Sequence, residues 1–298
     1  MFLLAHLSDP HLAPLPTPRI GELASKRLLG YLNWVRKRHA IHRRDVLAAI
    51  VADLHAAKPD HIAVTGDLVN IALPAEIANA ARWLETLGPP AQVSLVPGNH
   101  DAYVPGAVEL CTGIWASYIA GDAAGGANMR SMDEAFPFLH IRGQVALIGV
   151  STAVATGPFL ATGRLGARQI TRMSRLLAAT ADRFRVVLIH HPPHVAPKSR
   201  FKRLVDAAAF RDAIASAGAE LVIHGHDHVR SLDYIDGPGA RVPVIGVPSA
   251  SAAFGKDHDP AGYNLFRIDG TPAAWTCDVE RRGLDVRGAV TVCERFSF

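Results

Sequence analysis

Six short apolar stretches rich in β-branched residues recur along the chain, and they constrain its fold more than any other feature. They lie at residues 2–7, 60–65, 91–96, 145–150, 185–190 and 219–224. Segments with a helical pattern lie between them, at about residues 20–38, 43–57, 75–87, 107–119, 166–181 and 203–217. Short apolar runs separated by helices are typical of the strands of a layered α/β fold. The pattern therefore predicts an α/β protein.

The pattern changes after about residue 229. Short strands follow one another there, with turns at residues 236–239 and 269–270 and without a helical pattern. We expect a meander that completes a second sheet. No repeat or low-complexity linker divides the chain, and residues 121–131 have the composition of a mobile loop. The sequence therefore predicts a single domain over residues 1–298.

The composition is that of a soluble globular protein. Of the 298 residues, 49% are hydrophobic and 19% are charged, which is enough for a large core. No apolar run approaches the roughly 18–20 residues of a membrane span, and the first residues lack the charged start of a signal peptide. The three cysteines are widely spaced, without a C-x-x-C pair, as is usual for reduced thiols. We expect a cytoplasmic protein, and the net charge of +4 is too small to indicate nucleic-acid binding.

Polar residues that can bind metal ions follow five of the predicted strands. They stand in the stretches SDPHL, TGDLV, PGNHD, IHHPPH and HGHDH. A single Asp or His after a strand is more often a cap or a turn residue, but ligands of α/β proteins collect at the carboxyl ends of strands. Asp, His and Asn suit divalent Mn, Fe, Co or Zn. Because a carboxylate can bridge two ions, an inventory larger than one ion needs indicates a dinuclear site.

The order of these motifs is D-x-H, G-D, G-N-H-D, H and G-H-x-H, and it resembles the calcineurin-like metallophosphoesterase superfamily. The resemblance runs from Asp9 to His228. It implies a four-layer αββα sandwich, in which helices flank two mixed β-sheets. It also implies hydrolysis of a phosphoester with two divalent ions, for which we favour Mn or Fe, with Zn or Co as alternatives.

The resemblance assigns a role to each motif residue. It implies that Asp67 bridges two ions and that His100 takes part in catalysis without binding metal. One ion would be bound by Asp9, His11 and His228, and the other by Asn99, His190 and His226. Spacing alone leaves the choice between His190 and His191 open, since neighbours in a strand point to opposite faces, and the family pattern favours His190.

In the mechanism that we expect, a hydroxide between the two ions attacks phosphorus and His100 assists the leaving group. Asp101 is either a residue that orients His100 or a metal ligand, or an Asp that forms a local turn. His224 ends a strand, and we expect it to be structural or to support a ligand through a hydrogen bond.

Residues 19–45 form a basic and apolar insertion between the first two motifs. As a helix, it can pack on the body with a solvated basic edge, cover the metals and bind acyl chains or phosphate, or contact the inner face of a membrane. A second basic stretch, PKSRFKR at residues 197–203, makes Lys198 and Arg200 candidate substrate-binding residues, with a solvated loop as the alternative.

The basic segments favour a phosphodiester or pyrophosphate substrate, because they could hold groups on both sides of the reacting phosphorus. Two substrate classes remain open: a cyclic nucleotide or small phosphodiester, and a nucleotide-linked lipid such as UDP-diacylglucosamine. The alternative from another class is a non-catalytic metal-binding scaffold of the same fold, although every motif position is intact. The sequence makes no prediction of the oligomeric state.

Overall fold

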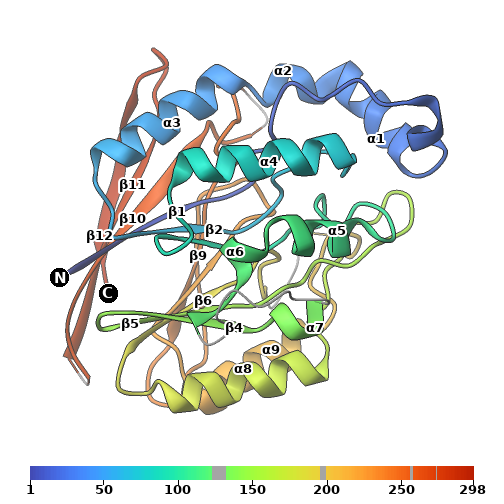
Figure 1. Ribbon diagram of the computed structural model, residues 1–298. Coiled ribbons are helices and arrows are strands. Elements are labelled where there is room, and N and C mark those ends of the chain that lie inside the picture. Colours follow the sequence, from blue (N-terminus) through green and yellow to red (C-terminus); the bar gives the residue numbers. More distant parts are fainter. Residues whose placement is uncertain (123–131, 195–198, 256–257, 273) are drawn as a thin grey trace.

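The structure is a computed structural model, and it describes residues 1–122, 132–194, 199–255, 258–272 and 274–298. Two six-stranded sheets pack face to face, and helices cover their outer faces (Figure 1). This confirms the four-layer αββα sandwich. The first strand runs from the N-terminus toward the end of the molecule where α1 lies, so the loops after the parallel strands gather at that end.

The first sheet has the strand order β12, β11, β10, β1, β2, β3. The strands β1, β2 and β3 are parallel, whereas β10 pairs antiparallel with β1 and continues into β11 and β12. The bounds of these strands are β1 (Phe2–Leu7), β2 (His61–Val64), β3 (Val93–Leu95), β10 (Gly262–Thr271), β11 (Ala274–Leu284) and β12 (Val290–Ser297).

The second sheet has the strand order β4, β5, β6, β7, β9, β8. The central strands β5, β6, β7 and β9 are parallel, and the edge strands β4 and β8 are antiparallel to their neighbours. The bounds are β4 (Phe138–Arg142), β5 (Val145–Gly149), β6 (Phe184–Leu188), β7 (Leu221–His224), β8 (Ser231–Ile235) and β9 (Val242–Gly246).

Two pairs of helices form the outer layers. The first sheet is covered by α3 (Arg44–Ala56) and α4 (Pro74–Leu87), and the second by α8 (Ala167–Ala179) and α9 (Ala207–Ala217) (Figure 1). Proline begins α4, where its missing N–H costs nothing. The other helices are η1 (Ile20–Leu23), α1 (Arg27–Asn33), η2 (Trp34–Arg38), α2 (His39–Ile41), α5 (Ala107–Ile114), α6 (Ala116–Ile119) and α7 (Met132–Ala135).

The six predicted strands before residue 229 are all present, but the prediction for the C-terminal strands was partly wrong. Only β8 and β9 join the second sheet, whereas β10 to β12 extend the first sheet from β1. Strand order depends on contacts between distant segments, which the local pattern does not contain. The sequence also failed to predict β4. Most of the predicted loop at residues 121–131 lies outside the described residues.

Apolar side chains from the inner faces of both sheets form one buried cluster. It contains Leu7 and Leu95 from the first sheet and Leu147 and Ile223 from the second. A second cluster lies between the second sheet and the helices α8 and α9. Among the described residues, no helix is long and apolar enough to cross a membrane. The core therefore fixes the two sheets against each other and aligns the loops at their carboxyl ends.

Candidate metal centre

The loops after β1 and β2 lie side by side, because the two strands are parallel neighbours and Leu7 pairs with Val64. The N–H of Asp9 donates to Gly66 O at 2.9 Å, and the N–H of His11 donates to Asp67 O at 3.1 Å. The D-x-H and G-D motifs are thus joined by backbone hydrogen bonds. From the second sheet, Gly225 N donates to His190 O at 3.2 Å and joins the two histidine loops in the same way.

Five predicted metal ligands have a left-handed backbone. Their φ angles are 52° at Asp9, 37° at His11, 56° at Asp67, 68° at His226 and 55° at His228. This conformation is uncommon for residues other than glycine and gathers at functional sites, where the surrounding structure maintains it. The tight loop bends turn these side chains toward the gap between the two sheets.

Asp9, His11 and His228 form the first half of the centre. The Nε2 atom of His228 lies 3.0 Å from Asp9 Oδ1 and 3.4 Å from His11 Nε2. The Nδ1 atom of His11 donates to Val69 O, which leaves Nε2 with its lone pair facing the other two side chains. The structure therefore brings together the three residues assigned to one ion.

Asp67, His190 and Asn99 form the second half. The Nε2 atom of His190 lies 3.4 Å from Asp67 Oδ2 and 3.2 Å from Asn99 Oδ1. The same Oδ2 atom of Asp67 lies 3.9 Å from His11 Nε2 in the first half. A single carboxylate thus reaches both halves, as a bridging ligand must.

His226 belongs to the second half by position. Its ring centroid lies 5.2 Å from that of His190, and its backbone N–H donates to Asp9 Oδ2 at 3.0 Å. The Nε2 atom donates to Lys202 O at 2.8 Å, so Nδ1 is the nitrogen left to bind an ion. Burial, and then the charge of His190, lower the pKa of His226 to about 4, which keeps this ring neutral.

His190 and His191, which spacing could not separate, have different surroundings. His190 bonds to Thr65 O through Nδ1 and turns Nε2 toward the acidic cluster. In His191 both ring nitrogens bind protein groups, since Nδ1 lies 2.7 Å from Thr152 Oγ1 and Nε2 lies 3.1 Å from Ala161 O. Of the two rings, that of His190 directs its Nε2 atom at the side chains of Asp67 and Asn99, which are themselves predicted ligands.

The donor set fits divalent cations, because the two carboxylates already attract positive charge. Although burial opposes protonation, Asp67 raises the pKa of His190 to about 10. The contact with His228 lowers the pKa of Asp9 below its usual value in spite of its burial. Two buried carboxylates among imidazole and amide donors form an oxygen and nitrogen site without thiolate, which is suited to Mn, Fe, Co or Zn.

Asp101 holds the Asp67 loop through its carboxylate. Its carboxylate accepts hydrogen bonds from the backbone N–H groups of Asp67, Leu68, Val69 and Gly98, at 2.8–3.2 Å. Burial, and then the nearby Asp67, raise the pKa of Asp101 to about 7. Of the two predicted roles, support of a metal-ligand loop therefore fits the structure, and a purely local turn does not.

His100 lies at the edge of the centre, next to Arg38 of the insertion. The Nδ1 atom of His100 donates to Asn70 O, and its Nε2 accepts from Arg38 Nη1 at 2.8 Å. Arg38 Nη2 also donates to His11 Nε2, at 2.9 Å. Burial, and then the positive charge of Arg38, lower the pKa of His100 to about 3. The ring is therefore neutral when it faces the guanidinium.

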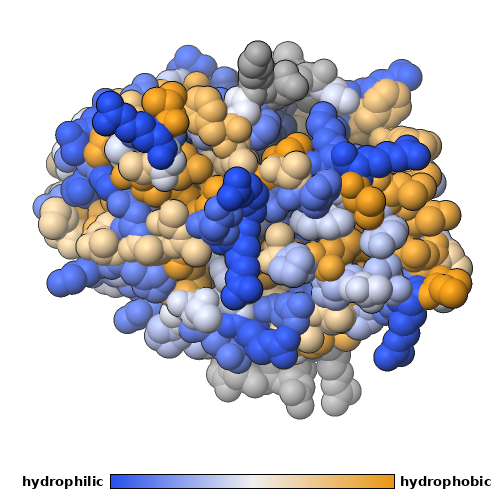
Figure 2. Space-filling view, turned by 90° about the horizontal axis from the view of Figure 1, so that it is seen from above, coloured by the Kyte–Doolittle hydropathy of each residue, from blue (hydrophilic) through white to orange (hydrophobic). Residues whose placement is uncertain are grey.

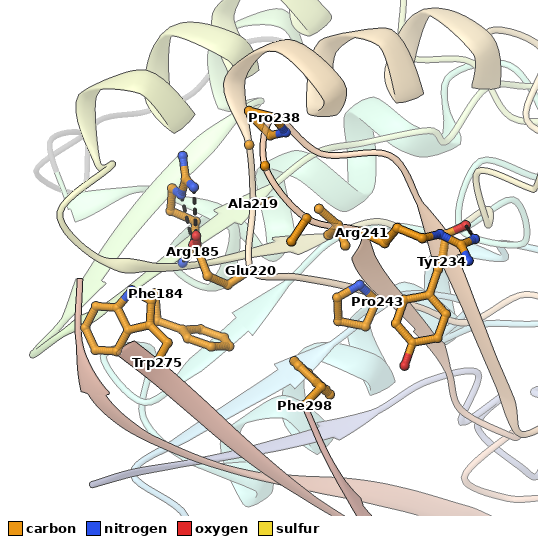
Figure 3. A pocket seen from close by; sticks show the side chains of 14 residues that line it. Phe184, Arg185, Ala219, Glu220, Tyr234, Pro238, Arg241, Pro243, Trp275 and Phe298 are labelled. Carbon is orange, nitrogen blue, oxygen red and sulfur yellow. Dashed lines mark hydrogen bonds and ion pairs between the residues drawn. The ribbon is translucent and has the colours of Figure 1, made fainter. Parts of the chain in front are cut away.

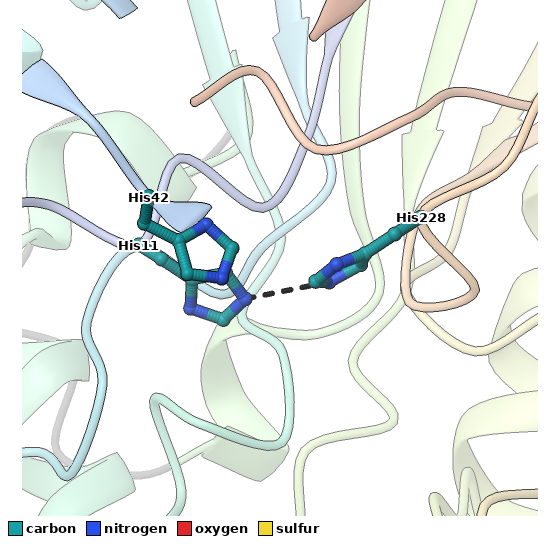
Figure 4. A group of neighbouring side chains, drawn as sticks. All are labelled: His11, His42 and His228. Atoms are coloured by element: carbon teal, nitrogen blue, oxygen red, sulfur yellow. Dashed lines mark hydrogen bonds between the residues drawn. The ribbon is translucent and has the colours of Figure 1, made fainter. Parts of the chain in front are cut away.

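No motif singled out Arg38 or His42, although both lie in the insertion that the sequence offered as a possible cover of the metals. His42 is buried, its ring centroid lies 4.5 Å from that of His11, and it lies beside His11 and His228 (Figure 4). Its Nδ1 bonds to Ser251 Oγ at 2.9 Å. Both residues come from the insertion and match no motif. Only the excess of basic and histidine residues near position 40 could have drawn attention to them.

The remaining candidates are less central. His224 bonds to Gly225 O through Nδ1 and to Ser231 Oγ through Nε2, so it holds the loop that carries His226. Lys198 lies outside the described residues, and its role stays a prediction. Arg200 lies over the ring of Phe201 and is not among the residues that line the cleft described next, whereas Lys202 is.

A cleft opens over the centre. Its metal end has a volume of about 740 Å³ and includes Asp67, His226 and His228 in its lining. A chamber of about 490 Å³ adjoins this end and shares Arg38, His100 and Lys202 with it. The insertion forms one wall of both spaces, so it covers the metal centre.

A separate cavity of about 410 Å³ lies at the opposite ends of β6 and β7 (Figure 3). The aromatic rings of Phe184, Trp275 and Phe298 line it, and the guanidinium of Arg185 pairs with Glu220 at 2.7 Å. This ion pair is internally satisfied and the motif loops lie at the other ends of the strands, so the cavity is separate from the candidate metal centre.

Comparison with known proteins agrees with this geometry. The profile of the calcineurin-like phosphoesterase family matches residues 2–230. A Synechococcus protein described as a probable cyclic nucleotide phosphodiesterase is 25% identical over 225 residues, which cover 74% of this chain and 77% of that protein.

Two solved structures share the fold. A dimetal phosphatase from Danio rerio superposes with a TM-score of 0.59 at 11% identity and covers 98% of both chains. A purple acid phosphatase from yellow lupin, Lupinus luteus, gives a TM-score of 0.57 at 14% identity and covers 99% of this chain and 53% of its own. Both have the sandwich of two mixed sheets flanked by helices.

Proposed function

This chain belongs to the calcineurin-like phosphoesterase family and is a metallophosphoesterase, and we propose that it hydrolyses a phosphodiester or pyrophosphate bond with two divalent ions. The position of Asp67 carries the proposal. Its Oδ2 atom lies 3.9 Å from His11 Nε2 and 3.4 Å from His190 Nε2, between the two halves of the centre. A carboxylate so placed suits a bridge between two ions.

In this proposal, Asp9, His11 and His228 bind one ion, Asn99, His190 and His226 bind the other, and Asp67 bridges them. We favour Mn or Fe, with Zn or Co as alternatives. When bound, the ions supply Lewis acidity, which activates water and neutralises charge on the phosphoryl oxygens. The protein positions these ligands through Asp101 and the hydrogen bonds between the motif loops.

We assign the assistance of the leaving group to His100. Its Nδ1–H is fixed by Asn70 O, so Nε2 is the nitrogen that faces the cleft. Arg38 now donates to this nitrogen and opposes its protonation. A substrate phosphate in the cleft would attract the guanidinium and favour the protonated ring, which could then give a proton to the leaving oxygen.

Two substrate classes fit the cleft. The likeness to the Synechococcus protein supports a cyclic nucleotide or another small phosphodiester. The apolar residues Leu29, Phe159 and Leu160, which line the chamber, support a nucleotide-linked lipid such as UDP-diacylglucosamine. A non-catalytic scaffold does not need metal ligands that are arranged for turnover. The close arrangement of these ligands therefore favours an enzyme.

A substrate panel tests the proposal. The protein, loaded with Mn, Fe or Zn, is assayed against bis-aryl phosphate, cyclic AMP, glycerophosphodiesters and UDP-diacylglucosamine. We expect metal-dependent turnover of at least one of them, and its loss in Asp67→Ala and after chelation. Metal binding without turnover of any substrate would favour the scaffold and overturn the enzyme.

We also propose peripheral contact of the insertion with an anionic membrane. Figure 2 shows the face of the molecule on which α1, α3 and α4 lie, where apolar and hydrophilic side chains are interleaved. Within the insertion, Val35 is 51% and Ile20 is 92% exposed. Lys26 and Arg27 bond to the body of the protein, which leaves Arg36 and Lys37 as the exposed cations of η2. Together these side chains have the character of an interfacial segment.

Co-sedimentation with phosphatidylglycerol vesicles tests the membrane contact. We expect the wild type to bind and the double variant Arg36→Gln, Lys37→Gln to bind much less, whereas the control Lys58→Gln, Arg168→Gln binds like the wild type. Equal binding of all three proteins, or binding by none, would remove the membrane contact from the proposal.

The buried cluster that joins both sheets supports one domain over residues 1–298. A single cooperative unfolding transition, seen alike by far-UV circular dichroism and tryptophan fluorescence, is the expected result. Two separate transitions would contradict it.

A further inference from the structure

The chamber beside the metal end is lined by cations and aromatic rings. Lys26, Arg38 and Lys202 contribute the positive charge, and none of its described lining residues is an Asp or Glu. The metal end also has cations in its lining, but it includes the carboxylates of Asp67 and Asp227. The chamber is therefore the part of the cleft whose described lining holds positive charge without a carboxylate, which suits an anion.

Arg38 is a cation without a carboxylate partner. Its guanidinium donates to the Nε2 atoms of His11 and His100, which are both neutral acceptors because Nδ1 of each ring binds a backbone carbonyl. Among the described residues, no carboxylate lies within ion-pair distance of it. Because His11 Nε2 is also the nitrogen assigned to an ion, metal binding would release the Nη2 donor of Arg38, and the guanidinium is then suited to bidentate binding of a phosphate that enters from outside.

Lys26 repeats this arrangement deeper in the chamber. Its ammonium donates to Thr156 Oγ1 and Leu160 O, both at 3.0 Å, and lies 4.5 Å from the centroid of the Tyr103 ring. These partners are neutral, and no described carboxylate pairs with Lys26. The insertion thus places two cations without a described carboxylate partner in the lining of the chamber, and of these two only Arg38 also lines the metal end.

The π-helical turn η2 explains how Arg38 reaches the centre. It spans Trp34–Arg38 and buries Trp34, and Arg38 is its last residue. Such turns are rare and occur often at functional sites, where they change the direction of side chains. The insertion is fixed to the body at Gly30, where an added Cβ would overlap with Ile71 and Tyr103.

We propose that the chamber binds a second phosphate of the substrate, so that the preferred substrate is an organic diphosphate ester cleaved at its anhydride bond. The inference rests on the proposed function and selects a substrate class for it. Addition of water breaks one P–O bond of the anhydride and gives two phosphate monoesters. One of them is left at the metal end and the other beside Arg38 and Lys26. A cyclic nucleotide has one phosphate and would leave these cations unpaired.

The chamber also has room for the organic group on the second phosphate. Trp34 and Tyr103 line it, and Phe159 stands at its wall with 86% of its side chain exposed. Phe159 has a φ of 64°, which is unfavourable for a bulky residue. An exposed ring held in this conformation offers a surface on which a base, sugar or acyl group can pack.

A binding experiment tests the inference without turnover. Titration calorimetry measures the affinity of the Mn-loaded protein for AMP and for α,β-methylene-ADP, which has one more phosphorus group and resists hydrolysis at the bridge. We expect the wild type to bind the methylene compound at least about tenfold more tightly than AMP, as charge-assisted hydrogen bonds to one more phosphate imply. Lys26→Gln and Arg38→Gln should each remove most of this preference.

Arg44→Gln is the matched control, because it removes one positive charge from the same region but lines neither space. It should keep the wild-type preference. Metal content and melting temperature are measured for each variant. If Arg38→Gln disturbs His11, the test relies on Lys26→Gln. If Lys26→Gln and Arg38→Gln both keep the wild-type preference, the inference is wrong.

The outcomes separate this inference from the proposed function. If the tighter binding of α,β-methylene-ADP than of AMP depends on Lys26 but the protein turns over no substrate, the phosphate site in the chamber is supported and the proposed hydrolysis is overturned. If the protein hydrolyses bis-aryl phosphate but Lys26→Gln and Arg38→Gln keep the preference for α,β-methylene-ADP, the proposed hydrolysis is supported and the phosphate site in the chamber is overturned.

Discussion

The motif loops and the insertion line the same cleft, but they are built differently. The loops are buried, and their side chains are held by backbone hydrogen bonds such as the four that Asp101 accepts. The insertion leaves Leu28, Leu32 and Val35 exposed and reaches the centre through Arg38 and His42. The loops therefore hold the candidate metal ligands in fixed positions, and the insertion adds a wall to the same cleft.

The motif loops and the insertion should differ most in how much a single substitution lowers the free energy of unfolding. Asp101→Asn replaces an acceptor oxygen by an NH₂ group that faces two buried backbone N–H groups, and we expect it to lower the free energy of unfolding by about 3 kcal/mol or more. Asp45→Asn, at the exposed Arg43–Asp45 pair of the insertion, should leave the free energy of unfolding nearly unchanged, because solvent screens such a pair. Urea denaturation of both variants measures the contrast, and similar losses would contradict the distinction between the two regions.

His100 lies where the two regions meet, so its effect should depend on the substrate. We expect His100→Ala to slow hydrolysis of an alkyl ester with a poor leaving group by about 10²-fold, because the leaving oxygen then lacks a proton donor. Hydrolysis of a nitrophenyl ester should change little. Steady-state kinetics on matched esters measures this difference, and an equal effect on both would exclude the assistance of the leaving group.

Histidines that are buried outside the cleft can show whether burial alone keeps an imidazole ring neutral. His61 bonds to Ser94, which bonds to His140, and burial, then His140, lower the pKa of His61 to about 3. The unfolded chain binds this proton near pH 6.5, so the stabilisation is complete above pH 6.5 and is lost as the pH falls toward 3. The loss should be about 2 kcal/mol at pH 5 relative to pH 8.

His61→Gln should lack this part of the acid sensitivity. The difference in unfolding free energy between the wild type and the variant, measured at pH 8 and pH 5, should therefore shrink by that amount. Parallel pH profiles for the two proteins would show that His61 is protonated in the folded state.

The smallest effects should come from glycines at the close contacts. A Cβ at Gly98 would overlap with Asp67 and His190, so Gly98→Ala should weaken metal binding about tenfold. Gly30→Ala would push the insertion from Tyr103 and should leave metal affinity nearly unchanged, as should Gly21→Ala, which meets no atom within 4 Å. Metal titrations compare the three, and a loss in Gly30→Ala equal to that in Gly98→Ala would show that the two regions act as one.

Much of the fold could be predicted because its signals are local. Alternating apolar runs and helical segments located the strands β1, β2, β3, β5, β6 and β7 within a few residues. The order of strands in the sheets could not be predicted, since β10 pairs with β1 across some 260 residues of sequence. The role of Asp101 also depends on a contact between distant segments. Its local sequence allowed a simple turn, but its hydrogen-bond partners include the distant Asp67 loop.

By itself the sequence predicted a metal site from its Asp, His and Asn residues after strands, and the resemblance of its five motifs to the family implied the reaction class and the candidate ligands. Only the tertiary structure shows that His190 and His191 have different surroundings, since both ring nitrogens of His191 bond to Thr152 and Ala161. It also placed Arg38 and His42 at the centre. Their positions arise from the packing of the insertion on the body, and packing between distant segments leaves no motif in the chain.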